Sequence, residues 1–448
     1  MKTNELKTNF QNSGIVGCGG AGFPTYAKLD ERAEVIILNC AECEPLLKSH
    51  QQLLSQNAFQ IANTFHKIAE TIGAQKAIIG IKKTYKSTIL AVNECLTQIP
   101  QLSLGLLDEI YPAGDEAVLI YELTGIVIPP GSLPIESGII VFNVETIYNA
   151  YRYLESGTPV TDKWVTVAGE VETPLTINVP IGTSAADAVM LAGGSKIKDP
   201  VYYFGGPMMG TIASAITPIT KTTNAILILP EDHLLVRRKR RKASVDLKRA
   251  AACCCQCEMC TELCPRHLLG HPVSPHLFMR AAVHPDNANS EKMLNTLFCS
   301  SCGLCENFAC MQGLSPRSLM ADYKTRLREQ GIKAPNDVLP APLNSERKYK
   351  RVPQKRLLAR LDLMKYQSDA PMSERAITIN KVKLLLNQHI GNPSIPNVEL
   401  SEKVTKGQLI AKPSQGLSVA LHASITGTIS AITENYIEVI NEQSNRHD

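Results

Sequence analysis

Ten of the 14 cysteines in this chain lie between residues 253 and 310, and this crowding constrains the fold more than any other feature of the sequence. In a reducing compartment such a group is better explained by metal or redox chemistry than by disulfides. The other four, Cys18, Cys40, Cys43 and Cys95, lie in the first hundred residues. We therefore expect a metal-binding module embedded in a larger protein.

The spacing of these cysteines predicts two iron-sulfur clusters. The first motif reads C-x2-C-x2-C-x3-C and is followed by Pro265, as in bacterial ferredoxins, whose fourth cysteine ligates the other cluster. The second motif has four residues before its last cysteine, and Met311 replaces the proline. With this exchange, one [4Fe-4S] cluster takes Cys254, Cys257, Cys260 and Cys310, and the other takes Cys299, Cys302, Cys305 and Cys264.

Three other interpretations of this region stay open. A pair of zinc ribbons would need only C-x2-C pairs, and would leave the triple repeats and the Cys-Pro unexplained. Cys253 and Cys255 flank a ligand, and in the run CCC the register could shift by one residue. His267 and His271 have the i, i+4 spacing of metal ligands on a helix, but we interpret them as solvated or hydrogen-bonded.

The length of 448 residues and the 44% hydrophobic composition suffice for about three cores. Short apolar runs at 35–38, 77–81 and 139–142 alternate with amphipathic stretches at 50–73, 85–98 and 144–155, which predicts an α/β layer fold. The predicted division is an α/β domain at 1–157, a small β-grasp module at 158–235, the helical two-cluster ferredoxin-like domain at 236–330, a linker with an amphipathic helix near 354–365 at 331–375, and an all-β domain at 376–448.

The net charge of +4 argues against nucleic-acid binding as the main activity of the molecule. The basic run at 237–242 is interpreted as a solvated linker, with docking of an acidic redox partner as the alternative. No apolar run approaches the roughly 18 residues that span a bilayer, and the polar N-terminal sequence has no signal-peptide core. We expect a soluble, cytoplasmic protein without a membrane span.

A glycine-rich segment, GCGGAG at 17–22, matches G-x-G-x-x-G, and Glu42 and Glu44 follow about twenty residues later. A dinucleotide-binding fingerprint also needs a full strand before the glycines, and only Ile15 and Val16 are available. Such a segment nevertheless brings backbone N–H groups close to a phosphate.

Four blocks together identify a family resemblance: GCGGAGFPTY at 17–26, NCAECEP at 39–45, AGDE at 113–116 and FNVET at 142–146. They resemble the flavin-binding subunit of respiratory complex I and the C subunit of the Rnf complex. The resemblance implies an FMN site at which NADH stacks over the flavin, with Phe23, Glu44 and Glu116 toward the nicotinamide. The residues that it implies around FMN are Gly17, Gly19, Gly20, Gly22, Lys28, Asn39, Glu42, Gly114, Asp115, Asn143 and Thr146.

This sequence departs from that family at two positions, where Cys18 replaces the usual arginine of the glycine loop and Ala41 replaces an aspartate. These changes bear on dinucleotide preference and affinity. Cys40 and Cys43 also have the spacing of a dithiol redox pair. A flavin loop that contains two thiols is the more economical interpretation.

The remaining blocks narrow the resemblance. Residues 164–210 resemble a soluble-ligand-binding β-grasp (SLBB) domain, and 404–430 resemble the lipoyl-like barrel sandwich of the Rnf C subunit. Residues 423–426 offer no lysine for a carrier function, so we expect a structural domain. The position of this domain after the clusters is that of the PduS-type cobalamin reductases of propanediol utilisation, which the chain resembles from end to end.

The resemblance implies an NADH-dependent oxidoreductase that reduces corrinoid cobalt, with no catalytic acid or base assigned. NADH gives two electrons and a cluster accepts one, so a flavin must stand between them. The implied partners are an adenosyltransferase that regenerates adenosylcobalamin and a shell protein of a bacterial microcompartment that encloses the enzyme. Two alternatives are an Rnf C-like protein for electron transfer between NADH and ferredoxin, and a non-catalytic scaffold with structural clusters.

Overall fold

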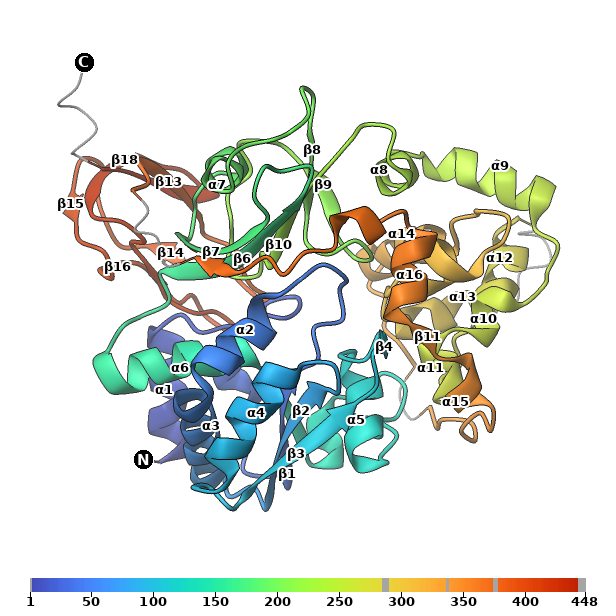
Figure 1. Cartoon of the computed structure of the whole chain (residues 1–448), viewed down its shortest axis with the longest axis horizontal. Helices are drawn as coiled ribbons and strands as arrows, with labels where there is room; N and C mark the ends of the chain where they lie inside the picture. The colour runs from blue at the N-terminus through green and yellow to red at the C-terminus, as the bar shows by residue number, and fades with distance from the viewer. Residues whose placement is uncertain (1, 284–289, 336–337, 374–377, 442–448) are drawn as a thin grey trace.

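The computed structural model describes residues 2–283, 290–335, 338–373 and 378–441. Figure 1 shows an N-terminal α/β part below, a second sheet above it, the cysteine-bearing helices on the right, and a C-terminal β part on the left. Within the described residues, no helix is long and apolar enough to cross a bilayer. The expected boundary at 375/376 lies outside the described residues, as does the end of the chain from 442.

The α/β part is built on a four-stranded parallel sheet of order β3-β2-β1-β5. Its strands are β1 (Val35–Cys40), β2 (Lys76–Lys82), β3 (Leu102–Leu107) and β5 (Ile139–Asn143). Three of them coincide with the predicted apolar runs, whereas β3 was not predicted. The chain runs outward from β1 to β3 and returns to β5 beside β1, so the sheet has its topological switch point between β1 and β5.

Helices cover both faces of this sheet. Ile36 and Leu38 pack in one core with α3 (Ala58–Ile72), and the intervening Ile37 packs in another with α5 (Glu116–Thr124), as the alternation along a strand requires. The amphipathic stretch 50–73 contains two helices, α2 (Ser49–Gln56) and α3, because Asn57 between them has non-helical dihedrals. The other helices here are α1 (Thr3–Asn12), α4 (Lys86–Leu96) and α6 (Val144–Ser156).

The second sheet has six strands in the order β12-β7-β6-β10-β8-β9. Its members are β6 (Asp162–Gly169), β7 (Leu175–Pro180), β8 (Val201–Phe204), β9 (Thr211–Ala213), β10 (Ala225–Leu229) and β12 (Met372–Ser373), with α7 (Ala185–Leu191) packed in the same core. The edge strand β12 comes from the segment that the sequence indicated as a linker. It pairs with β7 in parallel.

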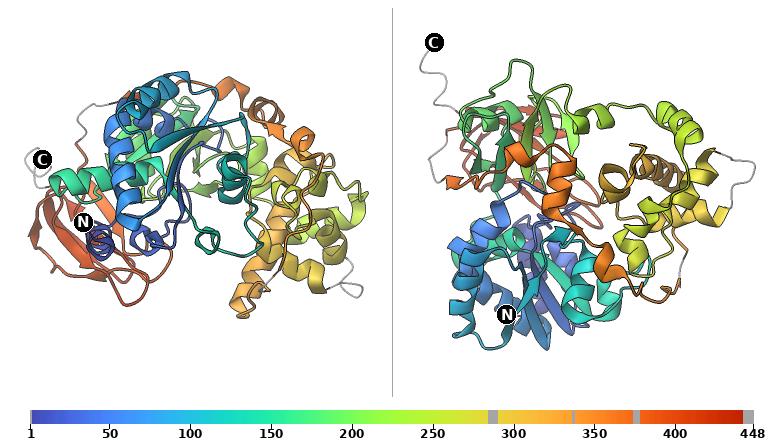
Figure 2. Two further views of the ribbon diagram at one scale, coloured as in Figure 1. Left: turned by 90° about the horizontal axis from the view of Figure 1, so that it is seen from below. Right: turned by 45° about the vertical axis from the view of Figure 1, so that its right-hand side comes forward.

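The expected linker is therefore part of the packed structure. Its strand β11 (Val352–Pro353) pairs with β4 (Ile110–Tyr111) of the α/β part. The amphipathic helix is α16 (Gln354–Arg360), shorter than expected, and it buries Leu357 and Leu358 in a core shared with the six-stranded sheet. This segment thus ties the two sheets together (Figure 2).

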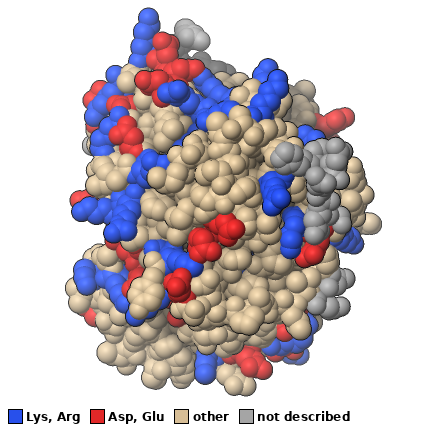
Figure 3. Space-filling model, turned by 90° about the vertical axis from the view of Figure 1, so that its right-hand side faces the viewer, with Lys and Arg blue, Asp and Glu red and all other residues tan. Residues whose placement is uncertain are grey.

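The cysteine-rich part is helical, but most of its cysteines lie in the loops between the helices. The helices are α9 (Ala243–Cys253), α10 (Met259–Glu262), α11 (Pro265–Leu268), α12 (Pro275–Val283), α13 (Ser290–Leu294), α14 (Pro316–Glu329) and a π-helix at Cys305–Ala309. Helices α11 and α14 begin with a proline, which has no N–H to lose at that position. The interpretation of 237–242 as a solvated linker was wrong, because the run begins inside α8 (Leu234–Lys239) and Arg238 and Arg241 bond Asn307 and Asp246. On the face in Figure 3, basic and acidic side chains are interspersed.

The C-terminal part is all β, as predicted. One sheet has the order β13-β19-β18-β15, and the other β14-β16-β17. The strands are β13 (Lys381–Leu385), β14 (Ile395–Pro396), β15 (Lys403–Val404), β16 (Leu409–Lys412), β17 (Leu421–His422), β18 (Gly427–Ile432) and β19 (Tyr436–Ile440). Buried residues of these strands belong to the same core as α1, α3 and β1.

A buried lysine joins three parts of the chain. Lys221, which is 2% exposed, donates from Nζ to the carbonyls of Gly14 (2.8 Å) and Ala420 (3.0 Å). Its backbone N–H donates to Gln388 Oε1 at 3.0 Å. No carboxylate among the described residues forms an ion pair with it, and burial lowers its pKa to about 7.

This lysine predicts a pH-dependent stability. The unfolded chain keeps a lysine pKa of about 10.4, so between pH 7 and 10 it binds more protons than the folded chain, and raising the pH stabilises the fold through this group. The Tm of the unmodified protein should therefore increase relative to the Tm of Lys221→Met as the pH rises from 7 to 10. A difference in Tm that stays constant across this range would contradict the assignment.

Candidate functional site

A cavity lies at the carboxyl edge of the parallel sheet, where β1 and β5 meet. Asn143 ends β5, Asn39 is the next-to-last residue of β1, and the two are partners in the strand register. Ligands of open α/β sheets bind outside the carboxyl ends of the strands at such a switch point. The cavity has a volume of about 400 Å³, within the range of small-molecule sites.

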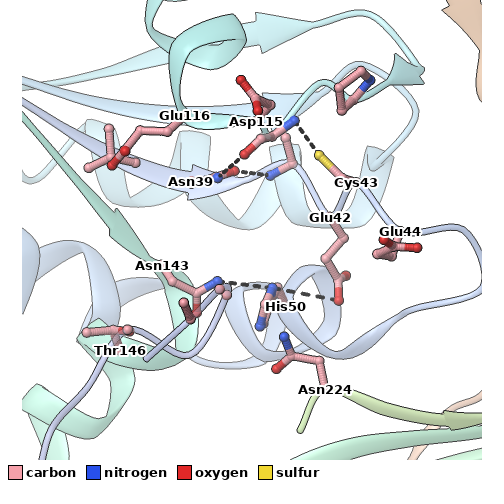
Figure 4. Close-up of a pocket in the computed structure, with 18 of the residues that line it drawn as sticks. Asn39, Glu42, Cys43, Glu44, His50, Asp115, Glu116, Asn143, Thr146 and Asn224 are labelled. Atoms are coloured by element: carbon pink, nitrogen blue, oxygen red, sulfur yellow. Dashed lines mark hydrogen bonds and ion pairs between the residues drawn. The ribbon is translucent and has the colours of Figure 1, made fainter. Parts of the chain in front are cut away.

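All residues that the resemblance assigned to the flavin and the nicotinamide line this cavity, several of them drawn in Figure 4. They are Gly17, Gly19, Gly20, Gly22, Phe23, Lys28, Asn39, Glu42, Glu44, Gly114, Asp115, Glu116, Asn143 and Thr146. They come from four separate segments of the α/β part. The fold therefore brings together one site from blocks that span about 130 residues.

The glycine loop is closed at its base and supported from below. Gly17 N–H donates to the carbonyl of Phe23 at 2.9 Å. Gly22 has φ +75°, and a Cβ there would lie 3.0 Å from the carbonyl oxygen of Gln388 in the C-terminal β part. Cys18 points into the protein, where Thr146 Oγ1 accepts its backbone N–H (3.1 Å) and burial raises the pKa of its thiol to about 11. Cys18, which stands where the resembled family usually has an arginine, therefore leaves the loop without a long side chain at this position.

Two strand-end loops are held together around Gly114. Asn39 Nδ2 donates to the Gly114 carbonyl at 3.0 Å, and Asn39 Oδ1 accepts the Ala41 N–H at 3.0 Å. Gly114 N–H donates to Cys43 Sγ, at 2.7 Å. A Cβ at Gly114 would lie 2.3 Å from the carbonyl oxygen of Ala41, so no other residue fits without separating the loops.

The two thiols of the dithiol alternative have separate environments. Cys43 Sγ accepts the Gly114 N–H, whereas Cys40 Sγ lies 3.8 Å from the His50 carbonyl oxygen. Burial raises the pKa of Cys43 to about 12 and that of Cys40 well above its usual value. Since a reactive cysteine needs a lowered pKa, this geometry favours two structural thiols.

Charged residues line one side of the cavity. Lys28 lies 3.6 Å from Glu116 and donates to the Val141 carbonyl at 3.1 Å. Asp115 accepts the Val118 N–H as the N-cap of α5 and pairs with Arg266 at 3.0 Å. Arg266 lies two residues after Cys264, so this ion pair joins the cavity to the cysteine-bearing helices.

Glu44 is bound to the second sheet. Its carboxylate accepts the backbone N–H groups of Met208 (2.8 Å) and Met209 (2.9 Å). Burial raises its pKa to about 7, although these two hydrogen bonds lower it. Figure 4 shows Glu44 turned away from His50, toward which Glu42 is directed. Glu44 therefore fixes the loop 205–210 at the rim of the cavity, besides lining it.

A buried polar network forms the opposite wall, and apart from Glu42 and Asn143 its members were not indicated by the sequence. His50 lies 3.3 Å from Asn143 Nδ2, 3.8 Å from Glu42 and 3.8 Å from Glu145. Glu145 pairs with Lys163. Lys163 in turn donates to Asn224 Oδ1 at 2.8 Å, and Asn224 lines the cavity. These residues have no shared spacing along the chain, so only the fold could reveal them.

The eight motif cysteines line two further cavities in the exchanged arrangement. Cys264, Cys299, Cys302 and Cys305 line one, which we name the cluster-two cavity. Cys254, Cys257, Cys260 and Cys310 line the other, named the cluster-one cavity. Among the described residues, no group of three or more His, Cys, Asp or Glu has the close arrangement that holds a single metal ion. The donor set, four thiols around a cavity, fits a cluster.

The structure distinguishes the other cysteines and histidines near the two cysteine cavities by whether they line a cavity. Cys255 lines the cluster-one cavity together with the four motif cysteines, whereas Cys253 does not, and both are exposed. His271 is buried and its Nε2 lies 2.9 Å from the Ile128 carbonyl oxygen. Neither His267 nor His271 lines a cysteine cavity. This agrees with their interpretation as residues other than metal ligands.

The flavin-type cavity and the cluster-two cavity adjoin. Ser300 and Cys302 line both. Tyr111, which lines the first cavity, donates from Oη to the Cys302 carbonyl at 2.5 Å. The cluster-one cavity shares no lining residue with the first cavity, and Cys257 in its wall is exposed. Consecutive residues line the two cysteine cavities, since Pro275 and Arg317 line the cluster-two cavity and His276 and Pro316 line the cluster-one cavity. The three cavities therefore follow one another from the sheet edge to the exposed Cys257.

The contacts of Gly114 predict a specific sensitivity. Gly114→Ala should lower the Tm by several degrees, because its methyl group collides with the loop 39–44. Gly20→Ala is the matched control, since a Cβ there meets no atom within 4 Å. Differential scanning calorimetry measures the Tm of both variants, and that of Gly20→Ala should stay close to that of the unmodified protein. Equal Tm values would show that the close approach at Gly114 imposes no constraint.

Comparison with known proteins agrees with this geometry. Residues 10–152 match the Nuo51 FMN-binding domain, 164–212 the SLBB domain, 253–315 the 4Fe-4S dicluster domain, and 360–445 the RnfC barrel sandwich hybrid domain. The matches to the FMN-binding and dicluster families establish a flavin domain and an iron-sulfur domain in one chain.

Curated relatives extend the likeness to the whole chain. It is 40% identical to "Cobalamin reductase PduS" of Salmonella typhimurium over 98% of this chain and 97% of that protein, and 40% identical to that of Citrobacter freundii over 97% and 96%. The C subunit of the Na(+)-translocating ferredoxin:NAD(+) oxidoreductase complex of Acetobacterium woodii is 30% identical over 60% of this chain and 59% of that protein. The chain belongs to the PduS cobalamin reductase family.

Proposed function

We propose that this protein oxidises NADH through bound FMN and passes the electrons through two [4Fe-4S] clusters to the cobalt of a corrinoid. One observation carries the proposal: the cavity that holds every flavin-motif residue shares Cys302 and Ser300 with a cavity of four cysteines. The name of its full-length relatives, cobalamin reductase, supports cobalt as the acceptor.

The residues of the first cavity suit FMN. The glycine loop offers backbone N–H groups to a phosphate, and Lys28 supplies a cation nearby. Asn39, Asn143 and Thr146 provide polar atoms at the strand ends, and the cavity is large enough for a ligand of this kind. Bound FMN would supply the chemistry that accepts a hydride and returns single electrons.

Phe23 and Glu116 remain the proposed neighbours of the nicotinamide. Phe23 offers an apolar face beside the glycine loop, and Glu116 is half-exposed, with 43% of its side chain accessible. Glu44 is assigned a supporting part in addition, because two backbone amides already occupy its carboxylate. It orients Met208 and Met209 at the rim of the cavity.

The series of cavities gives the proposed order of electron flow. Each NADH leaves as NAD⁺ and yields one proton and two electrons, and each cluster takes up one electron at a time. The electrons pass first to the cluster that Cys302 ligates and then to the cluster bound by the exposed Cys257. Two Co(III) centres become Co(II), or one becomes Co(I), and the proton goes to solvent.

The biological setting is proposed on the full-length likeness alone. We propose an adenosyltransferase as the consumer of reduced cobalamin, and a microcompartment of the cytoplasm with its shell protein as the setting, in 1,2-propanediol degradation. The divisions at 157, 235 and 330 are likewise kept as proposals, whereas residues of the segment 331–375 pack against the two sheets and do not form a separate linker. An Rnf C-like function has weaker support, since that likeness covers 60% of this chain.

The direct test is anaerobic NADH oxidation with hydroxocobalamin as acceptor. Cys257→Ala removes an exposed ligand of cluster one, so NADH should still bleach the flavin absorbance, whereas the rate of cobalamin reduction should fall by at least tenfold. Cys253→Ala is the matched control, because this cysteine is equally exposed but lies outside the cavity. Equal cobalamin reduction by Cys257→Ala and the unmodified protein would contradict the proposed route.

The order of the clusters has its own test. In Cys264→Ala, cluster two loses a ligand, so NADH should no longer produce the EPR signal of reduced cluster one. In Cys257→Ala, NADH should still produce a signal, that of cluster two. Freeze-quenched EPR of the two variants measures this. Reduction of cluster one by NADH in Cys264→Ala, with cluster two absent, would overturn the order.

A further inference from the structure

The walls of the two cysteine cavities carry different charges. Arg266 and Arg317 line the cluster-two cavity, whereas the charged residue that lines the cluster-one cavity is Glu258. Glu258 is well exposed and lies 3.5 Å from His276. The charged residues that line the cluster-two cavity are therefore more positive than those that line the cluster-one cavity.

The two arginines are not equivalent. Arg266 is paired with Asp115 at 3.0 Å, so its charge is largely neutralised. Arg317 has no carboxylate among the described residues within the 4.0 Å of an ion pair. Its Nε donates to the carbonyl of Ser301 at 3.3 Å, in the loop between two cluster-two cysteines. Arg317 therefore contributes an unpaired cation that is anchored beside the cluster.

A second cation lies on the same helix. Lys324 Nζ donates to the carbonyl of Cys299 at 2.8 Å. The carboxylate of Glu306 accepts hydrogen bonds from Ser318 N–H (2.8 Å) and Oγ (3.0 Å), next to Arg317 in the sequence. Helix α14 thus presents Arg317 and Lys324 to the loop that carries Cys299 and Cys302.

These cations act against the effect of burial. Cys264 and Cys305 are each 8% exposed, whereas Cys257 of cluster one is exposed. Four thiolates make a cluster net negative, and reduction adds one more negative charge, which a buried site disfavours. A nearby cation stabilises the added charge, and more strongly where the dielectric constant is low.

We propose that Arg317, assisted by Lys324, raises the reduction potential of cluster two and so makes this buried cluster able to accept an electron from the flavin side. The inference rests on the proposed function. One electron enters the cluster, no bond forms or breaks, and the proton from NADH oxidation stays outside the cluster. Arg317 acts as a residue that sets a potential.

The test is an anaerobic EPR-monitored redox titration of the holoprotein and of Arg317→Met. At the midpoint potential of cluster two in the unmodified protein, the ratio of reduced to oxidised cluster two should fall about tenfold in the variant, which equals about 59 mV for one electron. The cluster-one midpoint should move less. Arg317→Lys should retain most of the original potential, because it keeps the charge.

Arg326→Met is the matched control, since Arg326 lies on the same helix but is exposed and paired with Asp322 at 2.9 Å. Lys324→Met is the second variant, in which cluster two should also move to a more negative potential. An unchanged midpoint in either cation-to-Met variant with full iron content would overturn the inference, as would an equal shift in Arg317→Lys. A preparation without flavin or iron would instead refute the proposed function.

Discussion

The exchange of Cys264 and Cys310 between the two cysteine motifs is the constraint on which the arrangement of this protein depends. Each of the two cavities is lined by three of the motif cysteines from one stretch and one from the other, so residues 254–264 and 299–310 must fold against each other. That packing brings Cys302 to the wall of the flavin-type cavity.

The other parts hold this junction in place. Asp115 and Arg266 connect the cavity to the cysteine motif, and Glu44 connects it to the second sheet. Lys221 joins the glycine-loop segment to the C-terminal β part, whose contact with Gly22 supports the loop from below. The barrel-type domain therefore has a structural part at the flavin site, although it contributes no side chain to the cavity wall.

The sequence predicted those features that follow from local spacing. The cysteine spacing predicted the exchanged grouping in which the motif cysteines line two cavities, and the apolar runs predicted three of the four parallel strands. The strand β3 was missed because Gly105 and alternating exposure weaken its pattern. The segment 331–375 was predicted to be a linker because it is rich in prolines and basic residues. Its short strands β11 and β12 pair with β4 and β7, which are far away in the sequence.

The residues of the candidate site also include some that the sequence could predict and others that it could not. Its motif residues could be found because a family resemblance named them, whereas His50, Asn224 and Tyr111 come from segments without a recognisable motif. The sequence also could not predict that Arg266 is paired whereas Arg317 is not. The partner of Arg266 is Asp115, which lies 151 positions away in the sequence. Ion pairs between residues that are far apart in the sequence cannot be predicted from a single sequence.

The most direct measurement of the central claim is the composition of the protein prepared without oxygen. Elemental analysis and flavin extraction should give about eight iron atoms and one FMN per chain, and NADH should reduce both chromophores in the same sample. Zinc in place of iron, or iron clusters that stay oxidised while the flavin is fully reduced by NADH, would contradict a continuous path from the flavin to the clusters.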